Sequence, residues 1–179
     1  IDVGEVNGAV FLCTSMVGVF PLLARRRERE RHDKNPLKWI SAAIATIAAL
    51  RRHSPSLLRL DSGKEFERVK TYAVIVTNNL YEGDIFGPSL KRTVLDGGML
   101  VVHIAKQESP LGMMLLLAEL FLGNWRGDPE LDIKEVQQLN VHTGRKRSLN
   151  VMNDGEVLLL ETPLHYRILP RALNVLVPA

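Results

Sequence analysis

The feature that most constrains the fold is a regular alternation of apolar residues near the C-terminus, interrupted by the turn sequence Asn153-Asp154-Gly155. Alternation with a period of two is typical of half-buried strands, and Asp-Gly between two such runs predicts a tight hairpin turn. The apolar residues of these runs are Leu149 and Val151, then Leu164, Tyr166 and Ile168, and finally Leu173, Val175 and Val177. The sequence therefore predicts a C-terminal antiparallel sheet with strands over residues 164–168 and 173–177.

The turn also places two carboxylates, those of Asp154 and Glu156, at the tip of the predicted hairpin. Asp-Gly is a common turn sequence, so the spacing alone favours a turn with a purely structural role. The alternative is a functional turn, because a carboxylate at the end of a rigid sheet can be aimed at a substrate.

The rest of the chain alternates between predicted strands and helices. Strands are predicted over residues 10–15, 56–60, 71–77 and 100–105, with a polar segment over residues 61–70. Helices are predicted over residues 22–32, from Asn35-Pro36 to about residue 52, and from Ser109-Pro110 to Leu122. With 46% hydrophobic and 24% charged residues, the 179-residue chain can bury a globular core. We expect an α+β fold, an antiparallel β-sandwich of about nine strands flanked by two or three helices.

Two of the predicted helices carry surfaces with two interpretations each. The first contains five arginines interleaved with glutamates, namely Arg25, Arg26, Arg27, Arg29 and Arg31. This pattern favours a solvated helix face, and the alternative is a basic surface for anionic lipid headgroups. Residues 111–122 are apolar on nearly all sides, which favours packing in the core. The alternative is an acyl-chain pocket lined by the flexible side chains of Met113 and Met114.

Several classes of site are absent from the sequence. The five histidines are far apart and have no cysteine partner, so no zinc site is indicated, and no serine lies in a GxSxG motif. Ser62-Gly63-Lys64 is not a phosphate loop, because the upstream glycine is missing and Glu65 stands where Ser or Thr is needed. The basic residues 145–147 have no interleaved aromatic residues, so no nucleic-acid partner is predicted.

The cysteine content and the apolar runs bear on the compartment. The single cysteine, Cys13, excludes an internal disulfide and fits a reducing compartment. Because Cys13 lies in the predicted apolar strand over residues 10–15, we expect a packed thiol. The longest apolar runs, residues 39–50 and 111–122, are too short to cross a bilayer. We expect a cytoplasmic protein that either is soluble or touches a membrane peripherally, from one side.

Four stretches occur in an order that resembles the C-terminal domain of the diacylglycerol kinase, bacterial lipid kinase and sphingosine kinase superfamily. They are VNGAVFLCTSMVGVF with RRRERER behind it, TNNLYEGDIFGP, VLDGGMLVVHIAK, and VMNDGE followed by PLHYRILPRALNVLVP. The resemblance implies that residues 1–179 are the second domain of a two-domain lipid kinase. The first domain of that family carries a GGDGT-type nucleotide-binding motif, which these residues lack.

The resemblance also implies an activity, the phosphorylation of diacylglycerol or a related lipid hydroxyl by ATP. We expect the isolated 179 residues to be inactive and to bind no ATP. One alternative is a non-catalytic lipid-binding β-sandwich domain, and another is a plain interaction module. The acceptor lipid is not identified by the sequence, and homodimer formation is left open.

Three candidate site residues follow from the resemblance. Glu156 matches the glutamate of the family's Asp-Gly-Glu turn, for which the implied role is general base, and Asp154 would orient that turn or a metal network. The family binds Mg²⁺ through an acid and backbone carbonyls at an Asp-Asp-Gly or Asn-Asp-Gly turn. Here Gly97 stands in the place of that acid and Asp96 comes one residue early. Retention of the site through Asp96 and loss of the site therefore both remain open.

Overall fold

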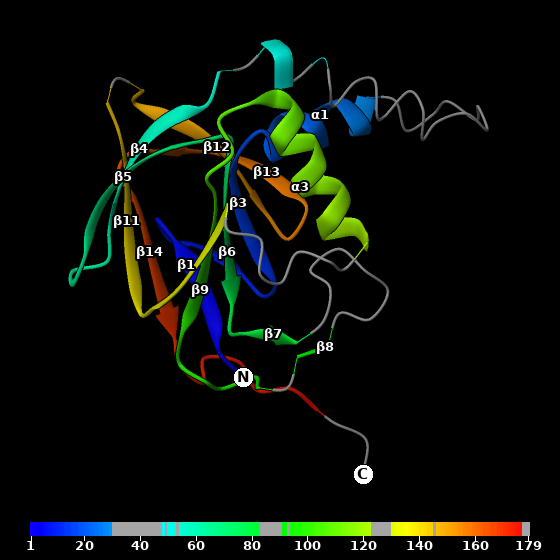
Figure 1. Cartoon of the computed structure of the whole chain (residues 1–179). Coiled ribbons are helices and arrows are strands. Elements are labelled where there is room, and N and C mark those ends of the chain that lie inside the picture. The colour runs from blue at the N-terminus through cyan, green and yellow to red at the C-terminus, as the bar shows by residue number, and fades with distance from the viewer. Residues whose placement is uncertain are drawn as a thin grey trace.

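The computed structural model describes residues 1–29, 48, 50–52, 54–82, 91–92, 94–122, 130–144 and 146–176. In this part of the chain two six-stranded antiparallel sheets face each other as a sandwich (Figure 1). The first sheet has the order β2 (Ala9–Phe11), β1 (Val3–Val6), β14 (Leu164–Leu169), β11 (Gln138–Thr143), β4 (Ser56–Asp61) and β5 (Phe66–Thr71). The second has the order β10 (Leu131–Val136), β9 (Leu100–Ala105), β6 (Ala73–Asn78), β3 (Thr14–Gly18), β12 (Ser148–Asn153) and β13 (Glu156–Glu161).

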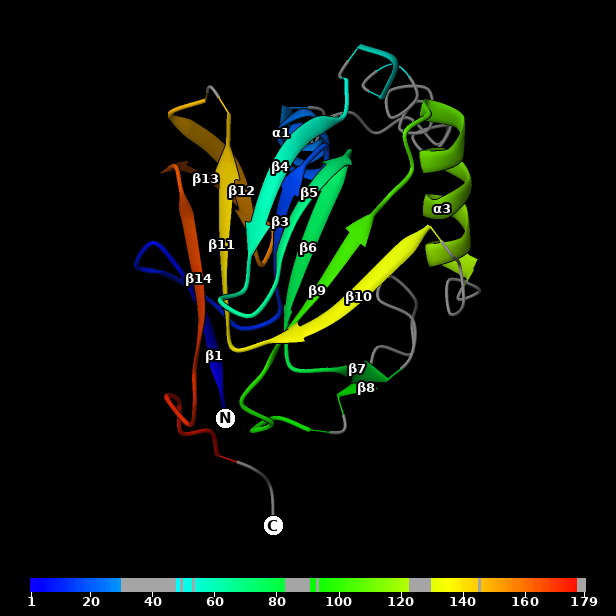
Figure 2. The ribbon, with the colours of Figure 1, turned by 60° about the vertical axis from the view of Figure 1, so that its left-hand side comes forward.

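Two helices and a short ribbon complete the described structure. Helices α1 (Phe20–Arg29) and α3 (Pro110–Leu122) lie on the outer side of the second sheet, and β7 (Tyr81–Glu82) pairs with β8 (Lys91–Arg92) (Figure 2). The predicted α+β sandwich is confirmed. The count of about nine strands was too low, because the described residues form twelve strands in the two large sheets alone.

Strands β6 and β9 of the second sheet are buried along their whole length because both of their faces are covered. On β6, Val74 and Val76 face the core between the sheets, whereas Ala73 and Ile75 face the helices. This double coverage explains why β6 and β9 read as nearly continuous apolar runs. In the first sheet β14 alternates as predicted, with Leu164, Tyr166 and Ile168 buried.

Two strand predictions are corrected by the way the chain changes sheets. The predicted strand over residues 10–15 is divided between β2 and β3, because the chain bends at Leu12 and Cys13 and passes from the first sheet to the second. Cys13 is exposed at this bend, so the prediction of a packed thiol is wrong. The predicted strand over residues 71–77 begins instead at Ala73, after a bend at Tyr72 where β5 of the first sheet leads into β6 of the second.

The other strand errors concern sheet edges. The polar segment over residues 61–70 contains β5, which is polar because it is an edge strand with one face in solvent. Residues 173–176 form no strand although they alternate, and 177 lies outside the described residues. Leu173 exchanges two backbone hydrogen bonds with Ile1, of 2.6 and 3.1 Å, and this contact is not extended into a ladder.

The helix predictions are confirmed where the structure describes them. Helix α1 begins two residues before the predicted start, and α3 spans Pro110–Leu122 as expected. The predicted helix after Asn35-Pro36 lies outside the described residues except at 48 and 50–52, which are helical.

Helix α3 packs one side against the second sheet and exposes another. Met113 and Leu116 are buried, whereas Leu111 and Leu115 are 67% and 58% exposed. The cavity beneath the helix has a volume of about 10 Å³, which is room for about one water molecule. The described residues therefore form no acyl-chain pocket beneath α3, and core packing is what its buried face provides.

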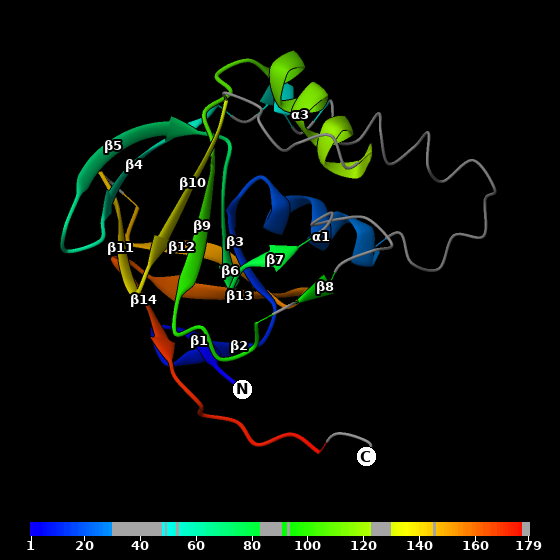
Figure 3. The same cartoon turned by 60° about the horizontal axis from the view of Figure 1, so that its bottom comes forward.

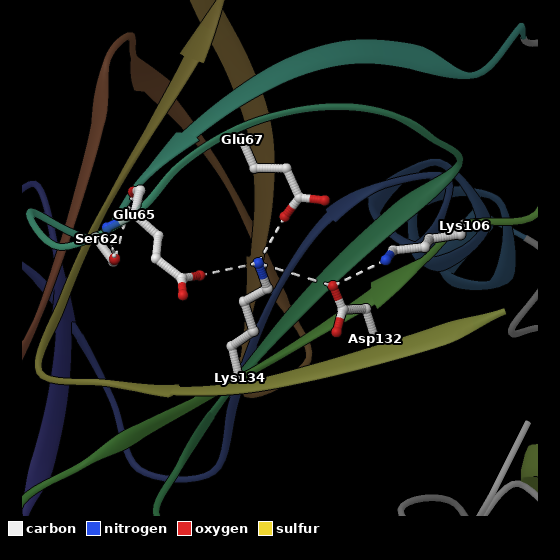
Figure 4. Close-up of polar contacts among 6 residues, drawn as sticks. All are labelled: Ser62, Glu65, Glu67, Lys106, Asp132 and Lys134. Atoms are coloured by element: carbon white, nitrogen blue, oxygen red, sulfur yellow. Dashed lines mark hydrogen bonds and ion pairs between the residues drawn. The ribbon is translucent and has the colours of Figure 1, made fainter. Parts of the chain in front are cut away.

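A group of charged side chains links the edge strands of the two sheets (Figure 4). Lys134 on β10 donates to Glu67 and Glu65 on the β5 side at 2.7 and 3.3 Å, and Asp132 lies 3.8 Å from its Nζ. The hydrogen bond with Glu67 is the main reason why the pKa of Lys134 is raised. Asp132 is also paired with Lys106 at 3.0 Å. These contacts join the edge of the first sheet at β5 to the edge of the second sheet at β10.

His103 predicts a pH dependence of stability. Its side chain is 4% exposed on β9, and burial lowers its pKa from 6.5 to about 4. The unfolded chain therefore binds a proton at a higher pH than the folded chain, so the stabilisation is complete above about pH 6.5 and is lost as the pH falls towards 4. We expect the free energy of unfolding to fall by about 2 kcal/mol between about pH 7.5 and about pH 5.

Urea denaturation at the two pH values measures this change. The variant His103→Leu should lose most of the pH dependence, whereas His165→Gln, a change at an exposed histidine, should keep it. An equal pH dependence in all three proteins would contradict the assignment to His103.

Candidate functional site

The site predicted at the C-terminal hairpin is built on β12 and β13, which pair from Ser148 with Glu161 to Asn153 with Glu156. Asp154 and Gly155 form the turn with φ values of +47° and +96°. A two-residue hairpin turn of type I′ requires a positive φ at both turn residues, and Asp-Gly adopts these values readily. The predicted hairpin is therefore confirmed, with Glu156 as the first residue of β13.

The carboxylate of Asp154 holds the turn against the bend between β2 and β3. It accepts hydrogen bonds from the backbone N–H groups of Leu12, Cys13 and Thr14 at 2.6, 2.8 and 2.8 Å. The N–H of Asp154 donates to the carbonyl of Thr14 at 2.9 Å. Since both carboxylate oxygens are engaged, this arrangement suits a positioning role better than proton transfer.

The side chain of Glu156 differs from that of Asp154 in its surroundings. It is exposed at the end of an edge strand, and no described residue forms a hydrogen bond or an ion pair with its carboxylate. A carboxylate in this position is free to accept a proton from a bound molecule.

A buried polar network beneath the turn was missed by the sequence analysis. Asn153 Oδ1 accepts a hydrogen bond from Ser15 Oγ at 2.6 Å, and Ser15 Oγ lies 3.1 Å from the hydroxyl of Tyr166. Tyr166 packs edge-on against Phe11, and burial raises its pKa, so its phenol stays protonated. The only signal for this network was Ser15, a polar residue in an apolar run. The network gives the turn a rigid support.

A buried carboxylate, that of Asp2, was also missed. It is fully buried and accepts hydrogen bonds from the backbone N–H of Gly98 at 2.7 Å, from that of Arg171 at 2.8 Å and from Asn79 Nδ2 at 3.3 Å. Burial raises the pKa of Asp2, but the hydrogen bonds from Arg171, Gly98 and Asn79 outweigh it, and the pKa is lowered. Asp2 is therefore ionised at neutral pH. An acid directly before an apolar strand was the available signal.

Asn78 lies between the hairpin turn at Asp154 and a second turn, residues 94–98, which contains Asp96 and Gly97. Its N–H donates to the carbonyl of Cys13 at 3.1 Å, and its Nδ2 donates to the carbonyls of Asp2 at 2.7 Å and Leu12 at 3.2 Å. The bend at Leu12 and Cys13 thus contacts Asp154 on one side and Asn78 on the other. Through the bend, Asn78 and Asp2, the hairpin turn is thus connected to the turn of residues 94–98.

The turn of residues 94–98 does not provide the ligands that a Mg²⁺ ion needs. Asp96 is 58% exposed, and its Oδ2 lies 3.9 Å from Nη2 of Arg171. Position 97 has no acid, and both oxygens of Asp2 are taken by N–H donors. Among the described residues, no group of three or more His, Cys, Asp and Glu could hold a metal ion. Since protein sites for Mg²⁺ rely on carboxylates, the described residues at this turn do not fit the ion.

Comparison with known proteins identifies the domain. Residues 16–177 match the model of the YegS C-terminal NAD kinase beta sandwich-like domain. The chain belongs to this family. The predicted resemblance is thereby confirmed, and the YegS C-terminal domain described here is a C-terminal domain of the lipid kinase superfamily.

Solved structures share the fold of this YegS C-terminal domain. A diacylglycerol kinase from Bacillus anthracis str. Sterne superposes with a TM-score of 0.60 and 21% identity, over 95% of this chain and 53% of that chain. A second structure from the same strain, named as a candidate diacylglycerol kinase, has a TM-score of 0.62 and 21% identity over 95% and 54% of the two chains. The chain thus spans about half the length of these proteins, and at this identity the likeness shows the fold alone.

The predicted membrane-facing surface is described in part. Arg25 is exposed on α1, whereas the side chains of Arg26, Arg27 and Arg29, and the whole of Arg31, lie outside the described part. None of the helices in that part has the length and apolar character needed to cross a membrane.

Proposed function

We propose that this chain is the acceptor domain of a lipid kinase that transfers the γ-phosphoryl group of ATP to the hydroxyl of diacylglycerol or a related lipid. The observation that carries the proposal is the exposed carboxylate of Glu156. It has no partner among the described residues, and it directly follows a turn that Asp154 and the Asn153 network hold. Membership of the YegS C-terminal family supports a kinase, and the name of the structural relatives suggests the lipid.

In this proposal Glu156 is the general base. Its carboxylate accepts the proton of the lipid hydroxyl while the hydroxyl oxygen forms a bond to the γ-phosphorus, and the bond from that phosphorus to the ADP oxygen breaks with its electron pair on ADP. The base has to reach the hydroxyl within about 2.6–3.2 Å, which an exposed side chain at a turn can do. The remaining catalysis depends on positioning and on electrostatic stabilisation of the phosphoryl group.

We assign ATP binding to another domain of a longer protein. The Ser62-Gly63-Lys64 segment is the turn of the β4–β5 hairpin, with Gly63 N–H bonded to Asp61 at 2.8 Å, and it offers no phosphate loop. Mg²⁺ would accompany ATP, and no step is assigned to a metal at the turn of residues 94–98.

A non-catalytic lipid-binding domain is the second candidate function. The observation that favours it is Gly97, because the family's metal-binding acid is missing. Incubating the full-length protein with labelled ATP, Mg²⁺ and diacylglycerol vesicles distinguishes the two. Labelled lipid is expected for the kinase, and vesicle binding without labelled lipid would leave only the second function.

We also propose that the side of the molecule with α1 and α3 contacts the membrane. Leu111 and Leu115 are one helical turn apart and exposed on α3, and Arg25 is exposed on α1. Both helices cover the same sheet (Figure 3). Apolar side chains of α3 and basic side chains of α1 can therefore contact the membrane together.

Replacing Arg25, Arg26 and Arg27 with alanine should weaken binding to anionic vesicles at least about tenfold, since each basic residue near the surface contributes about 1 kcal/mol. Raised salt should weaken wild-type binding in the same way. Vesicle sedimentation with the full-length protein measures both effects. The control removes three basic residues from the β4–β5 hairpin, Arg59, Arg68 and Lys70, and an equal loss in this control would contradict a role specific to α1.

A further inference from the structure

We infer that the turn of residues 94–98 binds no Mg²⁺ in this protein, and that Asp2 and Asn79 hold the turn in its place. The inference concerns the structure of the turn, so it stands whether or not the chain serves a lipid kinase. Four observations around the turn carry it.

The first is that the side chain of Asn79 crowds position 97, where the family has an acid. A Cβ atom at Gly97 would lie 3.0 Å from Asn79 Oδ1 and 3.2 Å from Val94 Cγ1. These separations are shorter than ordinary contacts, so Asn79 and Val94 have to shift by a few tenths of an ångström to admit a side chain at position 97. Asn79 therefore crowds the position at which the family's metal-binding carboxylate would begin.

The second is that Asn79 is held firmly in this place. Its backbone has a φ of +62°, and its N–H donates to the carbonyl of Met99 at 3.0 Å. Its Nδ2 donates to Asp2 Oδ2 and to Asn78 Oδ1, both at 3.3 Å. The buried Oδ1 faces Gly97 and has no hydrogen-bond partner among the described residues. One neutral amide oxygen cannot replace a carboxylate for Mg²⁺, which gives up its water reluctantly.

The third is that Asp2 holds the turn through fixed hydrogen bonds. Its N–H donates to the carbonyl of Leu95 at 2.8 Å, and its carboxylate accepts from the N–H of Gly98 at 2.7 Å, so one residue holds both ends of the turn. The other carboxylate oxygen accepts from the N–H of Arg171, in the segment after β14. The buried negative charge is thus balanced by fixed N–H donors, without a cation.

The fourth is that Asp96 does not compensate for the missing acid. Its side chain is largely exposed and faces the guanidinium of Arg171 across 3.9 Å. At this separation and exposure the pair contributes little stability, but the positive charge of Arg171 opposes the approach of a cation to Asp96.

The test uses Mn²⁺ as a probe for a Mg²⁺ site in the full-length protein without nucleotide. Binding is measured by the loss of the paramagnetic resonance signal of the free Mn²⁺ ion. The double variant Asn79→Gly/Gly97→Asp restores an acid and removes the side chain that crowds it. Glycine suits position 79 because of the positive φ there.

We expect the double variant to bind Mn²⁺ at least about tenfold more tightly than the wild type, because a carboxylate replaces an amide at a hard-ion site. Thermal melts should agree, since Mg²⁺ should raise the midpoint of the double variant and leave the wild-type midpoint unchanged. Gly97→Asp alone should bind Mn²⁺ more weakly than the double variant. Wild-type binding that Asp96→Asn abolishes, or a double variant that binds no better than the wild type, would overturn the inference.

Discussion

Glu156→Gln in the full-length protein is expected to lower kcat for lipid phosphorylation by a factor of about 10²–10⁴, the usual contribution of a positioned general base. Glutamine has almost the same shape as glutamate but cannot accept the proton. KM for the lipid should change little, because the lost interaction forms in the transition state. The turn itself needs only Asp154 and Gly155 to adopt its conformation, so the thermal midpoint should stay the same.

The matched control is Glu161→Gln, which removes a carboxylate from the other end of the same strand, where the side chain is also exposed. Steady-state kinetics and thermal melts of both variants make the comparison. Turnover near the wild-type value in Glu156→Gln, at an unchanged midpoint, would show that Glu156 is not the base. Equal losses in both variants would point to an effect of charge on the whole strand.

Among the substitutions proposed for this protein, Asp2→Ala should cause the largest loss of stability. We expect the free energy of unfolding to fall by about 3–5 kcal/mol. The change removes a buried ionised acceptor and leaves the N–H groups of Gly98 and Arg171 and the amide of Asn79 without it. A hydrogen bond to a charged group contributes about 1.5–3 kcal/mol, and the contributions of neighbouring bonds are not additive. Because the pKa of Asp2 is lowered in the folded protein, this stabilisation is present above about pH 4 and is lost as the pH falls below that value.

Urea denaturation measures the effect, with Asp61→Ala as the control. Asp61 also accepts a backbone hydrogen bond, from Gly63 at 2.8 Å, but it does so in an exposed hairpin and with a single donor. The control should lose only about 0.5–1.5 kcal/mol. Similar losses in the two variants would contradict the role given to Asp2.

The parts of the fold that follow from local patterns were predictable. The Asp-Gly turn requires positive φ values that few other residue pairs adopt, and β14 alternates because one of its faces meets the core. Helix α3 was found from its start signal and its apolar run. The family followed from the order of the motifs along the chain, and the family model confirmed it.

The errors occurred where a pattern depends on a distant partner. Residues 173–176 alternate like a strand, but only Leu173 forms backbone hydrogen bonds with Ile1. The polar β5 was missed because an edge strand keeps one face in solvent, and Cys13 was placed in a core because its neighbours are apolar.

The hairpin with Asp154 and Glu156 at its tip could be predicted from the residues alone, since turn geometry is a local property of a few residues. The groups that support that hairpin and the turn of residues 94–98 could be found only in the folded structure. Asp154 meets Leu12 across 142 positions of the chain, and Asp2 meets Gly98 across 96. Such contacts depend on which strands become neighbours when the two sheets pack, and residue periodicity carries no information about that choice.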